Sequence, residues 1–196
     1  MNRHVEFFFD VGSPASYLAW TQLHGRCARA EADLICRPML LGGVFQATGN
    51  ASPMAVPAKA NYTFVDLSRF AQRYGVALRM NPHFPINTLN LMRAACGVQA
   101  HAAQRFQGFL AALFNAIWVN AVNLNDPALA AQVLTDSGFD AAQVFGWAGE
   151  ADARARLRAN TDEAVSRGVF GAPTMFVGGQ MFFGQDRLEF VAEALA

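Results

Sequence analysis

The apolar residues near the start of the chain change their spacing twice. Residues 5–10 are mainly apolar, which predicts a buried strand. Residues 17–23 carry apolar side chains at the spacing of a helix. Residues 32–37 return to a strand pattern that ends at Pro38. This order predicts a strand, a helix and a second strand.

The pattern then becomes irregular. Residues 39–58 contain several glycines and prolines, which are typical of a loop. Because a connection of this length is unusual inside a compact domain, we expect either a functional loop or a short helix that the pattern does not reveal. A helical pattern covers residues 59–74 and ends at Gly75.

The rest of the middle of the chain is predicted to be helical. Two prolines in residues 81–85 force an extended turn, after which Asn87 or Thr88 can cap a helix. Alanine-rich segments predict further helices at about residues 101–119, 127–136 and 149–167.

The C-terminal part returns to strands. Residues 168–173 predict a turn, and residues 174–177 a strand. A Gly-Gly pair then predicts a hairpin, with its returning strand at residues 180–183. A last helix is predicted at residues 186–195.

Strands at both ends of the chain and helices between them predict an α/β fold. We expect a four-stranded sheet with a large all-helical insertion between its two halves. Residues 1–58 and 168–196 would form the sheet domain, and residues 59–167 the helical insertion domain.

Charge and composition exclude several classes of protein. The chain has no net charge at pH 7 and its charges are scattered, so we expect neither nucleic acid nor a membrane surface as a partner. No apolar stretch approaches the roughly 20 residues of a membrane span, and the first residues lack a signal-peptide pattern. The three cysteines have no disulfide or metal spacing, which favours buried thiols in a reducing cytoplasm. The four histidines show no metal-ligand spacing either, and we expect no metal.

The first strand-to-helix corner, Ser13-Pro14-Ala15-Ser16, is the strongest chemical signal. Ser before Pro is typical of a helix N-cap, and most such serines only cap. Backbone N–H groups and the helix dipole at such a corner stabilise an anion, either a thiolate or a carboxylate. In thioredoxin-like redox proteins this corner carries Cys-x-x-Cys. Because Ser13 and Ser16 replace both thiols, a disulfide oxidoreductase is excluded, and we expect a ligand to bring the thiol.

Two further pairs of residues carry candidate chemistry. Pro173, after Ala172, stands at the start of a predicted strand, which indicates a simple loop breaker or a tight turn with a cis peptide. Gln185 and Asp186 at the start of the last helix either cap it or hold the ammonium and carboxylate of an amino-acid-like ligand.

Two single residues are weaker candidates. Lys59 is either a solvated surface charge or a partner for a ligand carboxylate. Asn50, beside Gly49, is typical of a turn.

Several stretches taken in order resemble the 2-hydroxychromene-2-carboxylate isomerase family, bacterial relatives of kappa-class glutathione transferases within the thioredoxin-like superfamily. They cover nearly the whole chain, although residues 100–165 add little specificity. The stretches are residues 9–19, 49–50 with Lys59 downstream, 66–67, 84–88, 168–177 and 182–188.

The resemblance implies a role for each candidate residue. Ser13 matches the serine that contacts the sulfur of glutathione, the implied cofactor. Asn50 and Lys59 match positions that contact glutathione or substrate. The turn at Ala172 and Pro173 matches the backbone pair that holds the cysteinyl part. Gln185 and Asp186 match the positions that bind the γ-glutamyl end.

The resemblance also implies an activity. We expect a cytoplasmic, homodimeric enzyme with a thioredoxin-like fold that isomerises a small aromatic substrate by reversible addition of the glutathione thiolate. The alternatives are a kappa-class-like glutathione transferase, which releases the adduct, and a non-catalytic thioredoxin-like binding module. Apolar residues could line the substrate pocket or belong to the core, namely Phe45, Tyr62, Phe84, Leu89 and Met92.

Overall fold

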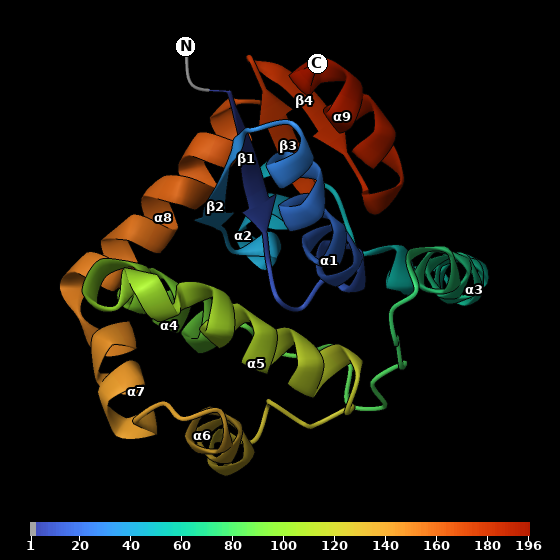
Figure 1. Cartoon of the computed structure of the whole chain (residues 1–196). Coiled ribbons are helices and arrows are strands. Elements are labelled where there is room, and N and C mark those ends of the chain that lie inside the picture. The colour runs from blue at the N-terminus through green and yellow to red at the C-terminus, as the bar shows by residue number, and fades with distance from the viewer. Residues whose placement is uncertain (1–2) are drawn as a thin grey trace.

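A four-stranded sheet forms the centre of residues 3–196, the part of the chain that the computed structural model describes (Figure 1). Its strands are β1 (His4–Phe9), β2 (Asp33–Pro38), β3 (Thr174–Val177) and β4 (Gln180–Phe183), in the spatial order β2-β1-β3-β4. β1 is parallel to β2 and antiparallel to β3, which forms the predicted hairpin with β4. The α/β class, the four strands and their assembly from both ends of the chain are therefore confirmed.

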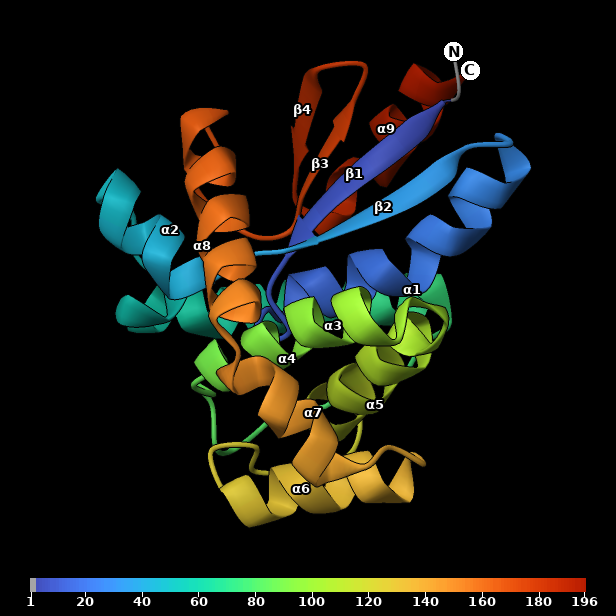
Figure 2. The ribbon, with the colours of Figure 1, turned by 90° about the vertical axis from the view of Figure 1, so that its left-hand side faces the viewer.

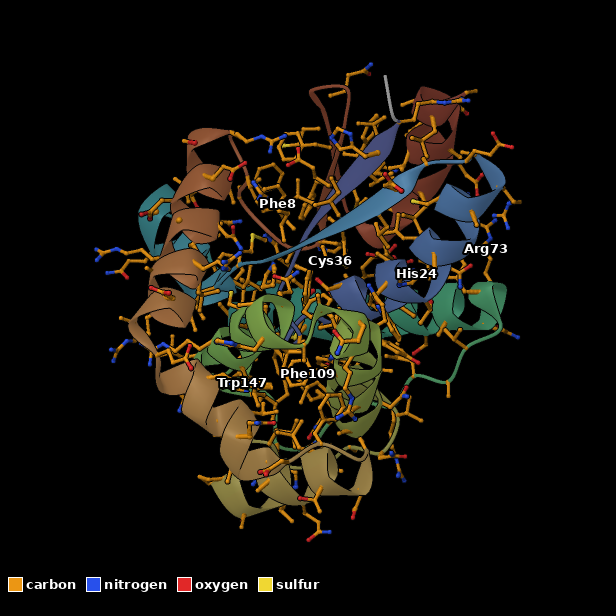
Figure 3. All side chains as sticks on the ribbon, turned by 60° about the vertical axis from the view of Figure 1, so that its left-hand side comes forward. Phe8, His24, Cys36, Arg73, Phe109 and Trp147 are labelled. Atoms are coloured by element: carbon orange, nitrogen blue, oxygen red, sulfur yellow. The ribbon has the colours of Figure 1, made fainter. Side chains whose placement is uncertain are left out.

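The central strand β1 divides the core between the two faces of the sheet. Phe7 and Phe9 stack on one face with their ring centroids 5.1 Å apart, and Phe9 also contacts Phe114. Phe8, which is labelled in Figure 3, lies on the other face. It packs edge-on against Phe176. Because successive residues of a strand point to opposite faces, a run that is apolar at consecutive positions is buried on both sides.

Helices cover both faces of the sheet. α2 (Leu41–Thr48) and α8 (Ala151–Ser166) pack on the face that holds Phe8. α1 (Pro14–Arg29) and α5 (Phe106–Trp118) pack on the opposite face. The remaining helices are α3 (Pro57–Tyr74), α4 (Leu89–His101), α6 (Pro127–Asp136), α7 (Ala141–Gly149) and α9 (Leu188–Leu195). Figure 2 shows α6 and α7 at the end of the molecule away from the strands.

The boundaries of some helices differ from those that the pattern predicts. Residues 39–58 hold α2 and a 3₁₀ turn at Pro53–Ala55, so the short-helix alternative is confirmed. The helix predicted at about residues 101–119 begins later, at Phe106, and is α5. The residues before it belong to the end of α4, which continues to His101, and to a 3₁₀ turn at Ala103–Arg105. α9 begins at Leu188, after a 3₁₀ turn at Gln185–Arg187.

α7 is a helix that the sequence pattern does not predict. Gly146 and Gly149 are weak helix formers and interrupt its apolar spacing. The helix is held instead by its packing on α4. A Cβ atom on Gly97 of α4 would lie only 2.7 Å from the Cβ of Trp147, so the glycine permits the close approach of the two helices.

A single cluster of buried apolar residues runs from the sheet into α4, α5, α6 and α7. It therefore crosses the boundary between the two domains expected from the sequence, and that division stays a prediction. Within residues 3–196, the helices are too short or too polar for any of them to traverse a lipid bilayer.

Candidate functional site

Ser13 caps the N-terminus of α1 and is buried. Its backbone is extended, and its Oγ accepts a hydrogen bond from the Ser16 N–H at 3.1 Å. Pro14 occupies the first turn, as expected. The structure therefore places one hydroxyl at the positive end of a 16-residue helix, where the dipole favours negative charge.

Ser13 also contacts the turn before β3. Its hydroxyl donates a hydrogen bond to the carbonyl of Ala172, with 3.0 Å between the oxygens. The Ala172–Pro173 peptide bond is cis, and the Pro173 carbonyl accepts from the Gly184 N–H at 3.0 Å. The cap of α1, the cis turn and the end of the hairpin therefore form one connected unit.

A cavity of about 290 Å³ opens at this unit. Five of the seven candidate residues line it: Ser13, Asn50, Ala172, Gln185 and Asp186. Its walls are largely aromatic and aliphatic side chains from α2, the 3₁₀ turn at Pro53–Ala55, α3 and the segment before α4, including Phe45, Met54, Tyr62, Phe64, Leu67 and Phe84. Such a combination of apolar walls with a few polar groups is typical of a small-molecule site.

The other two candidate residues lie outside the lining of this cavity. Pro173 is buried. Lys59, in the first turn of α3, is exposed. Any contact of Lys59 with a ligand therefore stays a prediction.

Asn50 holds the end of α2 against the turn before β3. Its Nδ2 donates to the carbonyl of Phe170 at 2.8 Å, and its Oδ1 accepts from the Ala51 N–H. Both polar ends of this side chain are thus used to shape the rim of the cavity.

Gln185 and Asp186 also line this cavity. Gln185 is buried, and its backbone carbonyl accepts a hydrogen bond from the hydroxyl of Tyr74 on α3 at 2.6 Å. The Asp186 carboxylate is partly exposed and lies 3.0 Å from the Arg187 guanidinium. A carboxylate at the mouth of the cavity is suited to an ammonium group.

Asp10 is a site residue that the sequence pattern does not single out. Its buried carboxylate accepts hydrogen bonds from the N–H groups of Gly12 and Leu41, both at 2.9 Å, and from the hydroxyl of Thr88 at 3.0 Å. Burial raises the pKa of this carboxyl, although the three donors oppose the shift. Asp10 thereby ties the loop before Ser13 to the starts of α2 and α4.

The only sequence signal for this role is a charged residue directly after a buried strand. Leu40, at the N-cap of α2, makes no side-chain capping bond, so Asp10 serves as the cap from a distant position.

The thiols of the protein take no part in the cavity. All three cysteines are free and buried. Burial raises the pKa of Cys27 and Cys36 to about 11 and that of Cys96 to about 12. Among residues 3–196 there is also no group of three or more His, Cys, Asp or Glu side chains that could hold a metal ion.

A second, more open compartment of about 850 Å³ adjoins the first. It lies between α2, α3 and the segment at residues 80–88. The two share a wall that consists of Gly12, Leu41, Phe45, Ser52, Met54, Phe64 and Phe84. Across this wall Phe64 and Phe84 pack edge to face, with their ring centroids 6.4 Å apart.

Comparisons with known proteins identify the family and the fold of the chain. The family model described as DSBA-like thioredoxin domain matches residues 4–196. The 2-hydroxychromene-2-carboxylate isomerase of Pseudomonas putida is 32% identical over 97% of this chain and 93% of its own. Glutathione S-transferase kappa 2 of Caenorhabditis elegans is 29% identical over 98% of this chain and 91% of its own. A solved selenomethionine 2-hydroxychromene-2-carboxylate isomerase is 30% identical, with a TM-score of 0.86 over 98% of this chain and 94% of its own.

Proposed function

The chain belongs to the DSBA-like thioredoxin domain family and to that of the 2-hydroxychromene-2-carboxylate isomerases, and we propose that it is a glutathione-dependent isomerase of related aromatic, unsaturated substrates. The observation that carries the proposal is the buried hydroxyl of Ser13 at the N-terminus of α1. It lines a cavity whose described wall contains no cysteine. A site built to stabilise a thiolate without its own thiol fits a thiol ligand.

The described residues also fit the other parts of glutathione. The carbonyl of Ala172 lies beside Ser13 and can accept the amide N–H of a peptide ligand. The carboxylate of Asp186, at the rim, can bind the ammonium of a γ-glutamyl group. Bound glutathione would supply the sulfur nucleophile that adds reversibly to the substrate double bond, so that rotation about the resulting single bond gives the isomer.

Ser13 would change its hydrogen-bond partner when the ligand binds. A serine hydroxyl has one proton, and here it is donated to Ala172. Donation to a thiolate instead would exchange a neutral hydrogen bond, worth about 1 kcal/mol, for a charge-assisted one of about 1.5–3 kcal/mol. The exchange frees the Ala172 carbonyl for the ligand amide.

The helix dipole adds about 0.3–1 kcal/mol in favour of the anion. Because one pKa unit corresponds to about 1.4 kcal/mol, the two effects together lower a thiol pKa by roughly one to two units from about 8.5. A thiol bound at Ser13 is then substantially ionised near neutral pH.

A kappa-class-like transferase is the second candidate, because the kappa relative matches almost the whole chain as well. The two functions differ in whether the adduct stays on the enzyme or is released. A homodimer and a cytoplasmic location also belong to the proposal, and light scattering and cell fractionation test them.

Calorimetric titration with glutathione tests the proposal directly. We expect binding of glutathione, and isomerisation of a chromene-type substrate only when glutathione is present. S-Methylglutathione, which has no ionisable thiol, is the matched control and should bind without supporting turnover. Chromatography of the products separates an isomer from a glutathione adduct. Absence of glutathione binding would refute the proposal.

A further inference from the structure

Ser16 carries the second hydroxyl of the corner that holds Ser13, and its side chain is fully buried. Its exposed fraction is 0%, and its Oγ has no hydrogen-bond partner among residues 3–196. A buried hydroxyl without a partner lowers the stability of a protein, and such groups are rare in folded chains. Ser16 is also absent from the linings of both compartments, so it does not contact a ligand itself. The fold alone therefore gives no reason for a hydroxyl at this position.

Hydroxyl groups inside a helix commonly donate to a carbonyl of the preceding turn. Six hydroxyls of the described helices do so over 2.7–3.0 Å, namely those of Thr21, Thr48, Ser68, Thr135, Thr161 and Ser166. Ser16 is only the third residue of α1, and the backbone of Ser13 before the helix is extended. Because no helical turn precedes Ser16, the usual acceptor is missing there.

The Oγ of Ser13 has room for one more donor. A hydroxyl oxygen has one proton to donate and two lone pairs that accept. Here the proton is donated to the Ala172 carbonyl, and one lone pair accepts from the Ser16 N–H. Within residues 3–196 no other group donates to this oxygen. An unused acceptor and an unused donor therefore lie three residues apart on α1.

Side chains at these two positions of a helix can meet, since residues three apart share a face. In Cys-x-x-Cys proteins a disulfide joins the same two positions, which requires Cβ atoms about 3.5–4.5 Å apart. A hydrogen bond between two hydroxyls, with about 2.7–2.8 Å between the oxygens, fits that spacing as well. The Ser16 hydroxyl can thus reach the Ser13 Oγ after a rotation of the side chains.

Resting on the proposed function, we propose that Ser16 is a positioning residue whose hydroxyl donates to the Ser13 Oγ when a thiolate is bound. Ser13 then turns its proton from the Ala172 carbonyl to the sulfur, and the Ser16 hydroxyl holds its oxygen in that rotamer. No proton is transferred, because Ser13 donates one hydrogen bond and accepts two. Hydrogen bonds in a chain strengthen one another, so donation from Ser16 strengthens the bond from Ser13 to the anion.

Ser16→Ala should have opposite effects on the free protein and on the glutathione complex. The free protein should melt at the wild-type temperature or above it, because an unpartnered buried hydroxyl is removed. In the complex, the pKa of the bound thiol should rise by about 0.5–1 unit and kcat/KM should fall about fivefold. Thiolate absorbance against pH measures the pKa. An unchanged thiol pKa would overturn the inference whatever the melting temperature, because a merely structural serine changes only stability.

Ser166→Ala is the matched control. Ser166 is also a serine of a helix, but its hydroxyl donates to the Glu163 carbonyl at 2.8 Å and it lines neither compartment. This variant should leave both the thiol pKa and kcat/KM unchanged. A change equal to that of Ser16→Ala would show that the effect is not specific to Ser16 and would also overturn the inference.

A thiol placed on the protein itself tests the donor without glutathione. Ser13→Cys puts a sulfur at the position of the Ser13 hydroxyl, where the Ser16 hydroxyl can donate to it directly. The pKa of this thiol, measured from the rate of alkylation by iodoacetamide against pH, should be about one unit lower than in the double variant Ser13→Cys/Ser16→Ala. The native thiols do not interfere, since burial raises their pKa values to about 11 or 12.

The two thiol measurements keep this inference separate from the proposed function. Equal pKa values in Ser13→Cys and in the double variant would refute the donor role of Ser16 even if glutathione binds. If glutathione does not bind to the wild type but the two pKa values differ, the proposed function is refuted and the donor role of Ser16 is supported.

Discussion

The Ser13 hydroxyl donates a hydrogen bond to the Ala172 carbonyl, 159 residues away in the sequence, over 3.0 Å. This bond joins the N-terminal half of the sheet to the cis turn of the C-terminal half. In the proposed mechanism, the hydroxyl proton leaves the Ala172 carbonyl before it is donated to a ligand sulfur.

Ser13→Ala should lower the isomerisation rate at least about tenfold, because the charge-assisted bond to the thiolate is lost. It should also raise the pKa of the bound thiol by about one unit. The ultraviolet absorbance of the glutathione thiolate, followed against pH in the complex, measures that pKa.

Loss of a helix cap alone must be separated from this effect. Asp140→Ala is a suitable control, since Asp140 caps α7 by accepting from the Gln143 N–H at 3.0 Å, far from the cavity. It should cost about 1 kcal/mol of stability without changing the rate. Wild-type turnover and an unchanged thiol pKa in Ser13→Ala would remove Ser13 from the mechanism.

Asp186→Ala should raise the dissociation constant of glutathione about fivefold, since a partly exposed ion pair contributes roughly 1 kcal/mol. Calorimetric titration measures the dissociation constant of glutathione. Asp162→Ala removes a comparable surface carboxylate, which lies 4.0 Å from Arg158 on α8, and should leave the constant unchanged. Equal affinities of both variants and the wild type would refute the contact.

Asp10→Ala should reduce the free energy of unfolding by about 2–4 kcal/mol, because it leaves α2 uncapped and two partly buried N–H groups without an acceptor. Urea unfolding measures the change. Asp10→Asn keeps one acceptor oxygen and should lose less. A wild-type midpoint for Asp10→Ala would show that the three hydrogen bonds of this carboxylate are not needed for the fold.

Glu6 should make the protein less stable in acid. Its hydrogen bond with Arg167, aided by the nearby charge of Arg37, holds the pKa of the carboxyl below its usual range. A carboxyl with a lowered pKa in the folded state stabilises the fold fully above its unfolded pKa, near 4.3, and loses that contribution as the pH falls through the lower folded value. Urea unfolding of Glu6→Gln across this range should show a weaker dependence on pH than the wild type. An equal dependence would mean that other carboxyls cause the loss.

Two glycines in helices should respond oppositely to substitution by alanine. Gly97→Ala forces a Cβ against Trp147 and should destabilise the protein by about 1–3 kcal/mol. Gly108 in α5 has open space around its Cα, so Gly108→Ala should stabilise by about 0.5–1 kcal/mol through helix propensity. Thermal unfolding compares the two, and a stabilised Gly97→Ala would show that α4 and α7 can separate at little cost.

The strands and most helices could be predicted because their own sequences carry the signal. The three phenylalanines of β1 are apolar at consecutive positions, which is typical of a strand buried on both faces. α7 gives no such signal, because its position depends on the missing side chain of Gly97 in another helix. Local patterns do not contain contacts of this kind.

The residues of the site also could be predicted only where their signal is local in the sequence. Ser13 could be singled out because a Ser-Pro cap is a local motif. The role of Asp10 could not, since its partners Leu41 and Thr88 follow it by 31 and 78 residues. The exposed position of Lys59 agrees with one of its two interpretations, a solvated surface charge. The helical pattern alone does not decide between them, because it shows which residues share a face and not which face borders a cavity.

The burial of the three cysteines has a consequence for the proposed use of a thiol cofactor. At a pKa of about 11, roughly one Cys27 or Cys36 side chain in ten thousand is ionised at pH 7. Oxidised glutathione therefore finds almost no nucleophile with which to form a mixed disulfide. Under the proposed function, the protein would therefore keep its own thiols unmodified over many turnovers.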